Sequence, residues 1–399
     1  MMLLAPAATA GTQYKILYSF DGGYGVGGPK GGPPTAAPIL DAHGNVYGPA
    51  GGGNGNSCEG PCGVIYKVAP DAKGKWHETV ALNFGSHSHH GWPDSNLSFD
   101  GHGNLYGSLS SYWVFQMNPR VRGGDLKMIY HGYGTDVGGV IADGTGKVYG
   151  ALGDKSNYRV TIGELSPGGD EWSYDALYTF CDDGDCIDGA FPRAPFSWGK
   201  DGTLYGTTFW GGNAGCYQHN GCGAAFQMVP NGDGTWKYSV AHRFAGTHRQ
   251  DGENPWGGLV MGTDGNLYGT TFYGGPNAVG TVFKLTPSGH GDWRETLIYG
   301  FPNVEQGAFP WGNLVFDGAG NLYGVANGGG VCDGDIFCGQ VFRLSPLKNG
   351  KWKYTVIHAF KGPDGAFPYG VAIDKQGNLF GTTLGGGANG YGVVFEITP

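Results

Sequence analysis

The chain has 399 residues, a formal net charge of −9 and no run of basic residues. Without basic runs, the counterion release that drives nucleic-acid binding and the attraction to anionic lipid are missing, so neither is an expected partner. Glycine occurs 81 times, and aromatic and charged residues each make up 14%. This mixture is not typical of a helical or α/β protein, and the many aromatic residues argue against disorder, so we expect a packed all-β fold.

The first ten residues, MMLLAPAATA, combine an apolar run with a small-residue end. The pattern resembles a shortened signal peptide without its basic start, and it is too short to span a bilayer. We therefore expect residues 1–10 to be a signal-peptide remnant and residues 11–399 to form a single domain. The expected location is secreted or cell-surface, with no insertion into the membrane.

The phrase LYG, or a close variant, recurs throughout the chain. Four strand-length apolar segments, separated by Gly, Asp, Asn and Pro, follow one another in the clearest copy, from Pro255 to Phe301. One four-stranded antiparallel unit per repeat predicts a seven-bladed β-propeller. The aromatic residue of the phrase repeats at a mean period of about 55 residues, in the range of propellers and solenoids, at Tyr47, Tyr106, Tyr149, Tyr205, Tyr268, Tyr323 and Phe380.

The two ends of the chain predict how the ring closes. The last copy stops after its third strand, at Tyr391 to Pro399, whereas the segment from Thr12 to Phe20 matches a fourth strand. We expect this N-terminal strand to complete the last blade, because that pairing removes an exposed edge.

Several recurring phrases carry a family resemblance: W-x-x-T-V-x-x-x-F, D-G-A-x-P, D-x-x-G-N-L-Y-G-T-T, G-G and G-T-V-F-x-L-T-P. They resemble the GloVer repeat of the choice-of-anchor tandem repeat proteins, bacterial surface or secreted proteins of largely unassigned function. The similarity covers nearly the whole chain and is most specific in the copies around Tyr205, Tyr268, Tyr323 and Phe380. It implies architecture and an extracellular location, and it transfers no catalytic motif.

Eight cysteines fall into four close pairs, which indicates disulfides formed in an oxidising compartment; a zinc site is the alternative, but the chain has no CxxC. The pairs are Cys58 with Cys62, Cys181 with Cys186, Cys216 with Cys222, and Cys332 with Cys338. Connections from strand D to strand A and from B to C share one face of a propeller, so all four pairs are expected there. Rigid loops prepared for binding, or protection from proteolysis, would explain such short bridges.

The phrase DGAFP, at 188–192 and 364–368 and as QGAFP at 306–310, lies in the D-to-A connections. We expect Asp188, Asp251 and Asp364 to accept hydrogen bonds from nearby backbone donors, with calcium or substrate contact as the alternative. The D-x-x-G-N phrase predicts a hairpin turn on the opposite face. The LYG tyrosines are expected to pack within the blades.

The residue after the corner proline begins the innermost strand at the mouth of the channel, and its type varies: Thr35, Asp94, Arg193, Trp256, Trp311 and Tyr369. Flat aromatic faces beside polar groups suit pyranose rings. We therefore expect a carbohydrate-binding cluster formed by Arg193, Trp210, Trp256, Tyr273, Trp311 and Tyr369. A plugged channel or packing between blades is the alternative, and a protein partner would use the same residues.

Two loops contain side chains of possible chemical use. The phrase SHSHHGWPD makes His90 and Asp94, with Arg193, candidate catalytic residues, although a loose histidine cluster is also an ordinary solvated loop. The acidic phrase CDDGDCIDG contains Asp182, Asp183, Asp185 and Asp188. Calcium is possible there, although the order differs from an EF-hand, and no cofactor is required.

Motifs for serine esterases, zincins and phosphate loops are missing from the sequence. A binding module for glycan, a polysaccharide lyase or glycoside hydrolase, and a structural or adhesive surface protein all stay open, because propellers host both binding and catalysis. The sequence favours the binding module.

Overall fold

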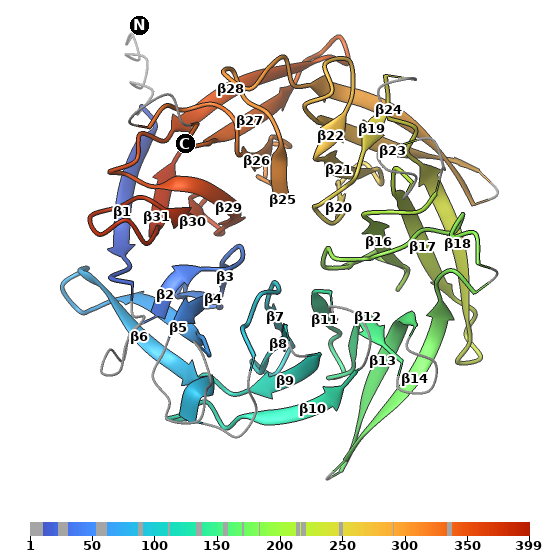
Figure 1. The fold of residues 1–399 in the computed structure, drawn as a ribbon, viewed down its shortest axis with the longest axis horizontal. Helices are drawn as coiled ribbons and strands as arrows, with labels where there is room; N and C mark the ends of the chain where they lie inside the picture. The colour runs from blue at the N-terminus through green and yellow to red at the C-terminus, as the bar shows by residue number, and fades with distance from the viewer. Residues whose placement is uncertain are drawn as a thin grey trace, which may run out of the picture.

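The computed structural model describes residues 11–22, 31–52, 62–86, 91–110, 112–132, 138–154, 159–169, 171–182, 184–212, 216, 221–246, 250–289, 291–332 and 337–399. In the described residues, seven antiparallel sheets of four or five strands stand around a central axis (Figure 1). The predicted seven-bladed propeller with four strands per blade is confirmed. No helix in these residues is long and apolar enough to cross a bilayer.

Each blade runs from an inner strand A to an outer strand D. Blades 1 to 3 comprise β2 (Gly31–Pro34) with β3 (Ile39–Leu40), β4 (Val46–Gly52), β5 (Val64–Pro70) and β6 (Trp76–Asn83); β7 (Ser98–Phe99), β8 (Leu105–Leu109), β9 (Trp113–Met117) and β10 (Lys127–His131); and β11 (Val140–Ala142), β12 (Val148–Gly153), β13 (Val160–Gly168) and β14 (Glu171–Thr179). A 3-10 turn, η1 (Phe84–Ser86), follows β6.

Blades 4 to 7 have the same order. They comprise β15 (Ser197–Trp198), β16 (Leu204–Thr208), β17 (Ala224–Pro230) and β18 (Trp236–Arg243); β20 (Val260–Met261), β21 (Leu267–Thr271), β23 (Thr281–Gly289) and β24 (Asp292–Gly300); β25 (Pro310–Phe316), β26 (Leu322–Ala326), β27 (Gln340–Pro346) and β28 (Trp352–Ala359); and β29 (Ala366–Ile373), β30 (Leu379–Gly385), β31 (Val393–Thr398) and β1 (Gln13–Ser19). A small pair, β19 (Gly252–Glu253) and β22 (Tyr273–Gly274), lies beside blade 5.

The N-terminal strand closes the ring as predicted. β1 pairs antiparallel with β31, with Gln13 opposite Thr398 and Ser19 opposite Val393. Figure 1 shows β1 as the outermost strand of the last blade, beside the C-terminus. β1 thereby covers the outer edge of β31, and the last blade reaches four strands like the others.

The hydrophobic core is divided among the blade boundaries. The buried clusters in the described residues each join two neighbouring blades, as when Phe244 of blade 4 packs edge-to-face on Phe283 of blade 5 at 5.0 Å. The glycine of LYG makes room for these rings, because a Cβ on Gly269 would lie 2.6 Å from Cζ of Phe283. The repeated phrase therefore encodes contact between blades.

The D-x-x-G-N phrase forms the A-to-B turn. Asp317 accepts hydrogen bonds from the backbone N–H groups of Ala319 and Asn321 at 2.9 and 2.8 Å, and from the hydroxyl of Tyr323 at 3.0 Å. Burial alone would raise the pKa of the Asp317 carboxyl, but a hydrogen bond from the Asn321 side chain, together with these donors, holds it below its usual value. Both the predicted turn and the predicted burial of the LYG tyrosines are confirmed, since Tyr323 is buried.

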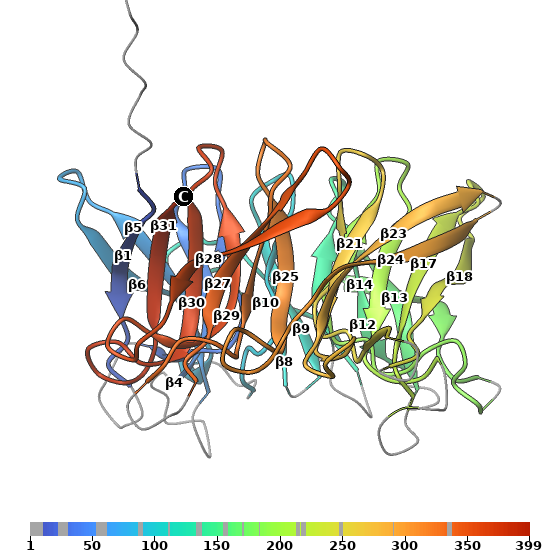
Figure 2. The ribbon, with the colours of Figure 1, turned by 90° about the horizontal axis from the view of Figure 1, so that it is seen from above.

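The connections from D to A and from B to C lie on one face, the lower face in Figure 2. We call it the loop face. Disulfides join Cys181 to Cys186 between β14 and β15, Cys216 to Cys222 between β16 and β17, and Cys332 to Cys338 between β26 and β27. Cys62 is also disulfide-bonded, whereas its predicted partner Cys58 lies outside the described residues.

Candidate functional site

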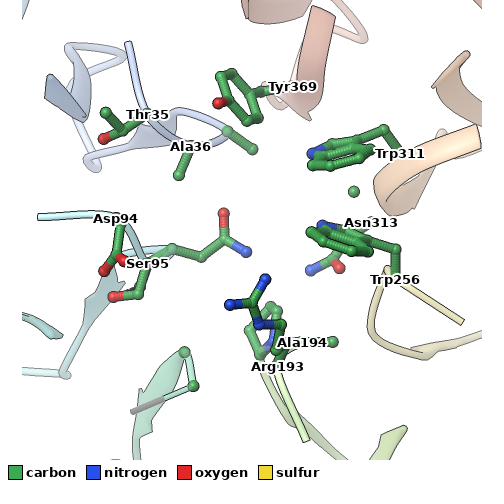
Figure 3. Close-up of a pocket in the computed structure, with 16 residues that line it drawn as sticks. Thr35, Ala36, Asp94, Ser95, Arg193, Ala194, Trp256, Trp311, Asn313 and Tyr369 are labelled. Carbon is green, nitrogen blue, oxygen red and sulfur yellow. Dashed lines mark hydrogen bonds between the residues drawn. The ribbon is translucent and has the colours of Figure 1, made fainter. Parts of the chain in front are cut away.

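A cavity of about 240 Å³ lies at the channel mouth of the loop face. Its walls are formed by residues at or close to the inner strands, including those that follow the corner prolines (Figure 3). The structure brings together there all six residues that follow a corner proline, namely Thr35, Asp94, Arg193, Trp256, Trp311 and Tyr369.

Three consecutive blades supply an aromatic wall. The ring centroids of Trp256 and Trp311 lie 4.2 Å apart with the planes tilted by 32°, and Tyr369 meets Trp311 edge-on at 6.2 Å. All three side chains are half-buried, so each keeps part of its surface accessible from the cavity. The alternative of complete burial between blades does not apply to them.

A second layer of phenylalanines supports this wall. Phe209 packs edge-to-face on Trp256 at 5.0 Å, and Phe272 packs edge-to-face on Trp311 at 5.5 Å. Each phenylalanine directly follows strand B of blade 4 or 5 and contacts the cavity tryptophan of the next blade. Rings held in this way lose little conformational freedom on binding, which reduces the entropic cost of association.

The remaining walls carry polar side chains, interspersed with Ala36, Ala37, Ala194 and Pro195. Arg193 places its guanidinium over the rings of Phe191 and Trp256, at 4.5 and 5.4 Å from the ring centroids. Asp94 and Ser95 lie across the cavity from the tryptophans (Figure 3). The pKa of the Tyr369 hydroxyl is raised, first by burial and then by the negative charge of Asp94. Tyr369 therefore remains a neutral hydrogen-bond donor at physiological pH.

Glycines let the inner strands meet backbone to backbone beneath the mouth. A Cβ on Gly257 would collide with the carbonyl oxygen of Gly312, and a Cβ on Gly312 with that of Tyr369. The Asn313 side chain then joins two blades by accepting a hydrogen bond from the N–H of Gly258 at 2.7 Å. Close approach of these strands keeps the aromatic wall compact.

Three polar residues that the sequence patterns did not indicate also line the cavity: Ser95, Asn96 and Asn313. Ser95 and Asn96 follow Asp94, and Asn313 follows Trp311 by two positions. Their closeness in sequence to residues after a corner proline could have identified them. Asn96 and Asn313 add amide groups, which can both donate and accept hydrogen bonds.

Two predicted contact residues lie outside the cavity. Trp210 stacks on Phe191 at 4.6 Å, and Tyr273 meets the edge of Phe272 at 4.6 Å. Tyr273 is 40% exposed and Trp210 is half-buried. They lie in the connections that follow strand B, Tyr273 within β22, and neither lines the cavity.

The corner aspartates accept hydrogen bonds from their own blade, as predicted. Asp188 accepts from the N–H of Cys181 and the hydroxyl of Tyr178, Asp251 from the N–H of Ala245, and Asp364 from the N–H of Lys361 at 2.7 Å. The predicted hydrogen bonds of these aspartates are therefore confirmed, and calcium or substrate contact stays an untested alternative.

The candidate metal and catalytic loops are only partly described. Asp182 forms an ion pair with Arg159 at 2.6 Å, Asp185 is exposed, and Asp188 faces its own blade. These three carboxylates do not converge, and no cluster of three potential metal ligands occurs in the described part of the chain. Asp183 and His90 lie outside the described residues, so calcium and catalysis at these loops stay sequence predictions.

This is a propeller whose loop face carries disulfides and whose channel mouth is an aromatic and polar cavity. Residues 217–399 match the profile of the Gloeobacter/Verrucomicrobia repeat. The chain thus carries this repeat, and the resemblance seen in its phrases is confirmed over that segment. No curated protein matches the chain.

Solved structures of three other proteins resemble the fold. A fungal alcohol oxidase in complex with copper has a TM-score of 0.55 and 15% identity, over 92% of this chain and 74% of that chain. A putative oxidoreductase (glucose dehydrogenase) from Thermus thermophilus has a TM-score of 0.44 and 18% identity, over 77% and 96%. A gluconolactonase from Xanthomonas campestris has a TM-score of 0.41 and 14% identity, over 76% and 84%. At such identities, the alcohol oxidase supports the propeller fold alone.

Proposed function

We propose that this protein is a secreted or surface-located binding module that takes a sugar ring of a glycan into the cavity at the channel mouth. The observation that carries the proposal is the pairing of Trp256 and Trp311, supported from behind by phenylalanines, with polar groups on the facing wall. The C–H face of a pyranose packs on aromatic rings, and its hydroxyls exchange hydrogen bonds with polar side chains.

The charges and donors of the facing wall fit such a ligand. Asp94 accepts hydrogen bonds from hydroxyls, Tyr369 donates, and the amides of Asn96 and Asn313 do both. Arg193 adds a positive charge at the side of the aromatic wall, which suits a carboxylate on an acidic sugar.

The size of the cavity favours a single ring inside it. Its volume of about 240 Å³ is below the range of roughly 300–1,000 Å³ that is usual for small-molecule sites. The rest of an oligosaccharide would therefore lie over the loop face. The disulfides on this face favour an oxidising, extracellular compartment for such an encounter.

Native mass spectrometry tests the proposal directly, with neutral cello-oligosaccharides and acidic oligogalacturonides incubated with the protein for several hours. A single spectrum reports both bound complexes and new products. Stable complexes that are weakened by Trp256→Ala and Trp311→Ala would support the binding module. Trp113→Ala is the matched control, because Trp113 is also half-buried but stacks on His131 in blade 2, away from the cavity.

Two other outcomes would contradict the proposal. New cleavage products that disappear in Asp94→Asn would make the protein a lyase or hydrolase. Complexes that survive both cavity variants, or the absence of complexes with either series, would remove carbohydrate binding from the cavity and point to a protein partner or a structural role.

A further inference from the structure

The residue before the corner proline has an unusual backbone. Phe191, Asn254, Phe309 and Phe367 all have positive φ, at 61°, 55°, 54° and 58°. Asparagine tolerates this left-handed region well, whereas it is unfavourable for phenylalanine. Three of the four blades therefore use a residue that does not suit the conformation.

Hydrogen bonds between blades impose the conformation whatever the side chain. The N–H of Phe367 donates to the carbonyl of Cys338 at 2.8 Å, and the N–H of Asn254 donates to the carbonyl of Cys222 at the same distance. Both acceptors are disulfide-bonded cysteines of the preceding blade. Asn254 thus shows, within the same molecule, which residue type meets this requirement with little strain.

Packing explains two of the three phenylalanines. Phe191 stacks on Trp210 at 4.6 Å, and Phe309 stacks on Phe272 at 5.1 Å. Phe367 differs, because its side chain is 38% exposed and it has no stacking partner among the described rings. Its ring contributes little to the core, so the fold alone does not account for it.

Phe367 lies at the start of β29, on the loop face and close in sequence to the cavity wall. It precedes Tyr369 of the cavity wall by two residues, and pairing of β29 with β30 brings it next to Leu384, which is 41% exposed. Other large apolar side chains exposed in the loop-face connections of blades 4 to 7 are Ile187, Tyr273, Val331 and Tyr391. The loop face therefore carries exposed apolar side chains on several blades, with Phe367 and Leu384 together on blade 7.

We propose that Phe367, with Leu384, is a second ligand-contact site, and that the ligand is a chain of at least two sugar units with one ring in the cavity and the next on Phe367. The inference rests on the proposed function and specifies its substrate class as an oligomeric glycan. A second pyranose packs its C–H face on the exposed ring, as the first does on the tryptophans.

Phe367→Asn is the decisive variant, because Asn254 already occupies the equivalent backbone position. Calorimetric titration with glucose, cellobiose, cellotriose and cellotetraose, and with the galacturonic acid series of the same lengths, measures how affinity depends on length. The expected result is a rise in affinity from monosaccharide to longer chains that Phe367→Asn reduces by about tenfold, the effect of losing one aromatic contact. The variant should unfold at the same temperature as the wild type, or at a higher one.

Three other outcomes would overturn the second contact site, alone or together with the proposed function. An unchanged length dependence in Phe367→Asn, with the monosaccharide still bound, overturns this inference and leaves the proposed function intact. A clear fall in unfolding temperature would show that the ring stabilises the fold and would also overturn it. The absence of binding by every member of both series would overturn the proposed function and this inference together.

Discussion

Tyr14 lies flat on His358 across the boundary between blades 7 and 6, with ring centroids 3.8 Å apart and planes 7° apart. The Tyr14 hydroxyl donates to the carbonyl of Asp364, and Nε2 of His358 contacts the Asp364 carboxylate at 2.9 Å. Tyr178 and Tyr238 stack in the same way between blades 3 and 4, at 3.8 Å. Closure of the ring therefore uses a contact that recurs elsewhere in the propeller.

Tyr14→Ala should lower the free energy of unfolding by about 2–4 kcal/mol, because a largely buried aromatic ring and its hydrogen bond are lost from the closing strand. Urea unfolding measures this change. Ile16→Ala on the same strand is the control, because Ile16 is 37% exposed and its loss should cost less than about 1 kcal/mol. Equal losses of stability in the two variants would show that the Tyr14 contact does not stabilise the pairing of the closing strand.

His358 should make stability depend on pH. Burial lowers its pKa below the ordinary value, although the Asp364 carboxylate opposes this shift. A lowered folded-state pKa means that the stability it contributes is complete above about pH 6.5 and is lost as the pH falls through the folded-state pKa.

His358→Tyr isolates this contribution. Tyr178 occupies the equivalent position in blade 3, where its hydroxyl donates to Asp188 at 2.7 Å, so the variant keeps both the stacking and the bond to the aspartate. Thermal unfolding between about pH 5 and pH 8 should show a weaker fall on the acid side in the variant than in the wild type. The same acid dependence in both proteins would assign it to other groups.

Glu295 should make stability fall as the pH rises, the opposite of the effect of His358. Burial, and next the charge of Asp251, raise its pKa to about 7, while His242 lowers it. A raised carboxyl pKa means that its stabilising effect is complete below about pH 4.5 and is lost as the pH rises through about 7. Glu295→Gln should therefore raise the unfolding free energy at pH 8 by on the order of 1 kcal/mol, a discounted value because solvent partly screens the carboxyl.

The control is the same comparison at about pH 4.5, where Glu295 of the folded wild type is already protonated. The unfolding free energies of the wild type and Glu295→Gln should be similar there. A variant that is less stable than the wild type at pH 8 would show that the ionised carboxylate contributes a favourable interaction.

Arg193 should determine preference for acidic ligands. Its guanidinium is held over Phe191 and Trp256 beside the cavity. Arg193→Gln should lower the affinity for oligogalacturonides by about tenfold, because one charge-assisted hydrogen bond is lost. The affinity for neutral oligosaccharides should change much less. Titrations at low and high salt check the cause, because a lost charge also removes the salt dependence of binding. Equal losses for neutral and acidic chains would make Arg193 a packing residue.

The repeated phrases made the architecture predictable, because each phrase corresponds to one physical requirement. The LYG tyrosine and the aspartate of the A-to-B turn meet through a hydrogen bond, as at Tyr323 and Asp317, and the glycine accommodates a ring of strand C. The position of the first strand followed from the incomplete last copy. Local sequence therefore contained enough information to count, order and close the blades.

The cavity was predictable only in part. The residue after each corner proline marked Trp256, Trp311 and Tyr369 correctly as neighbours, since seven equivalent strands must meet at one axis. The distance of Trp210 from the axis, and the stacking of Tyr14 on His358, depend on how far strands extend and how blades tilt. Those quantities arise from packing between repeats, which the pattern within one repeat does not encode.

The central claim is that the aromatic wall binds a sugar ring, and calorimetric titration of Trp311→Ala with the tightest-binding oligosaccharide of the two series tests it most directly. Because Trp311 lies 4.2 Å from Trp256 and lines the cavity, we expect its loss to weaken binding by at least about tenfold, while Trp113→Ala binds as the wild type does. Equal affinity of Trp311→Ala and the wild type would contradict the account and move the ligand away from the channel mouth.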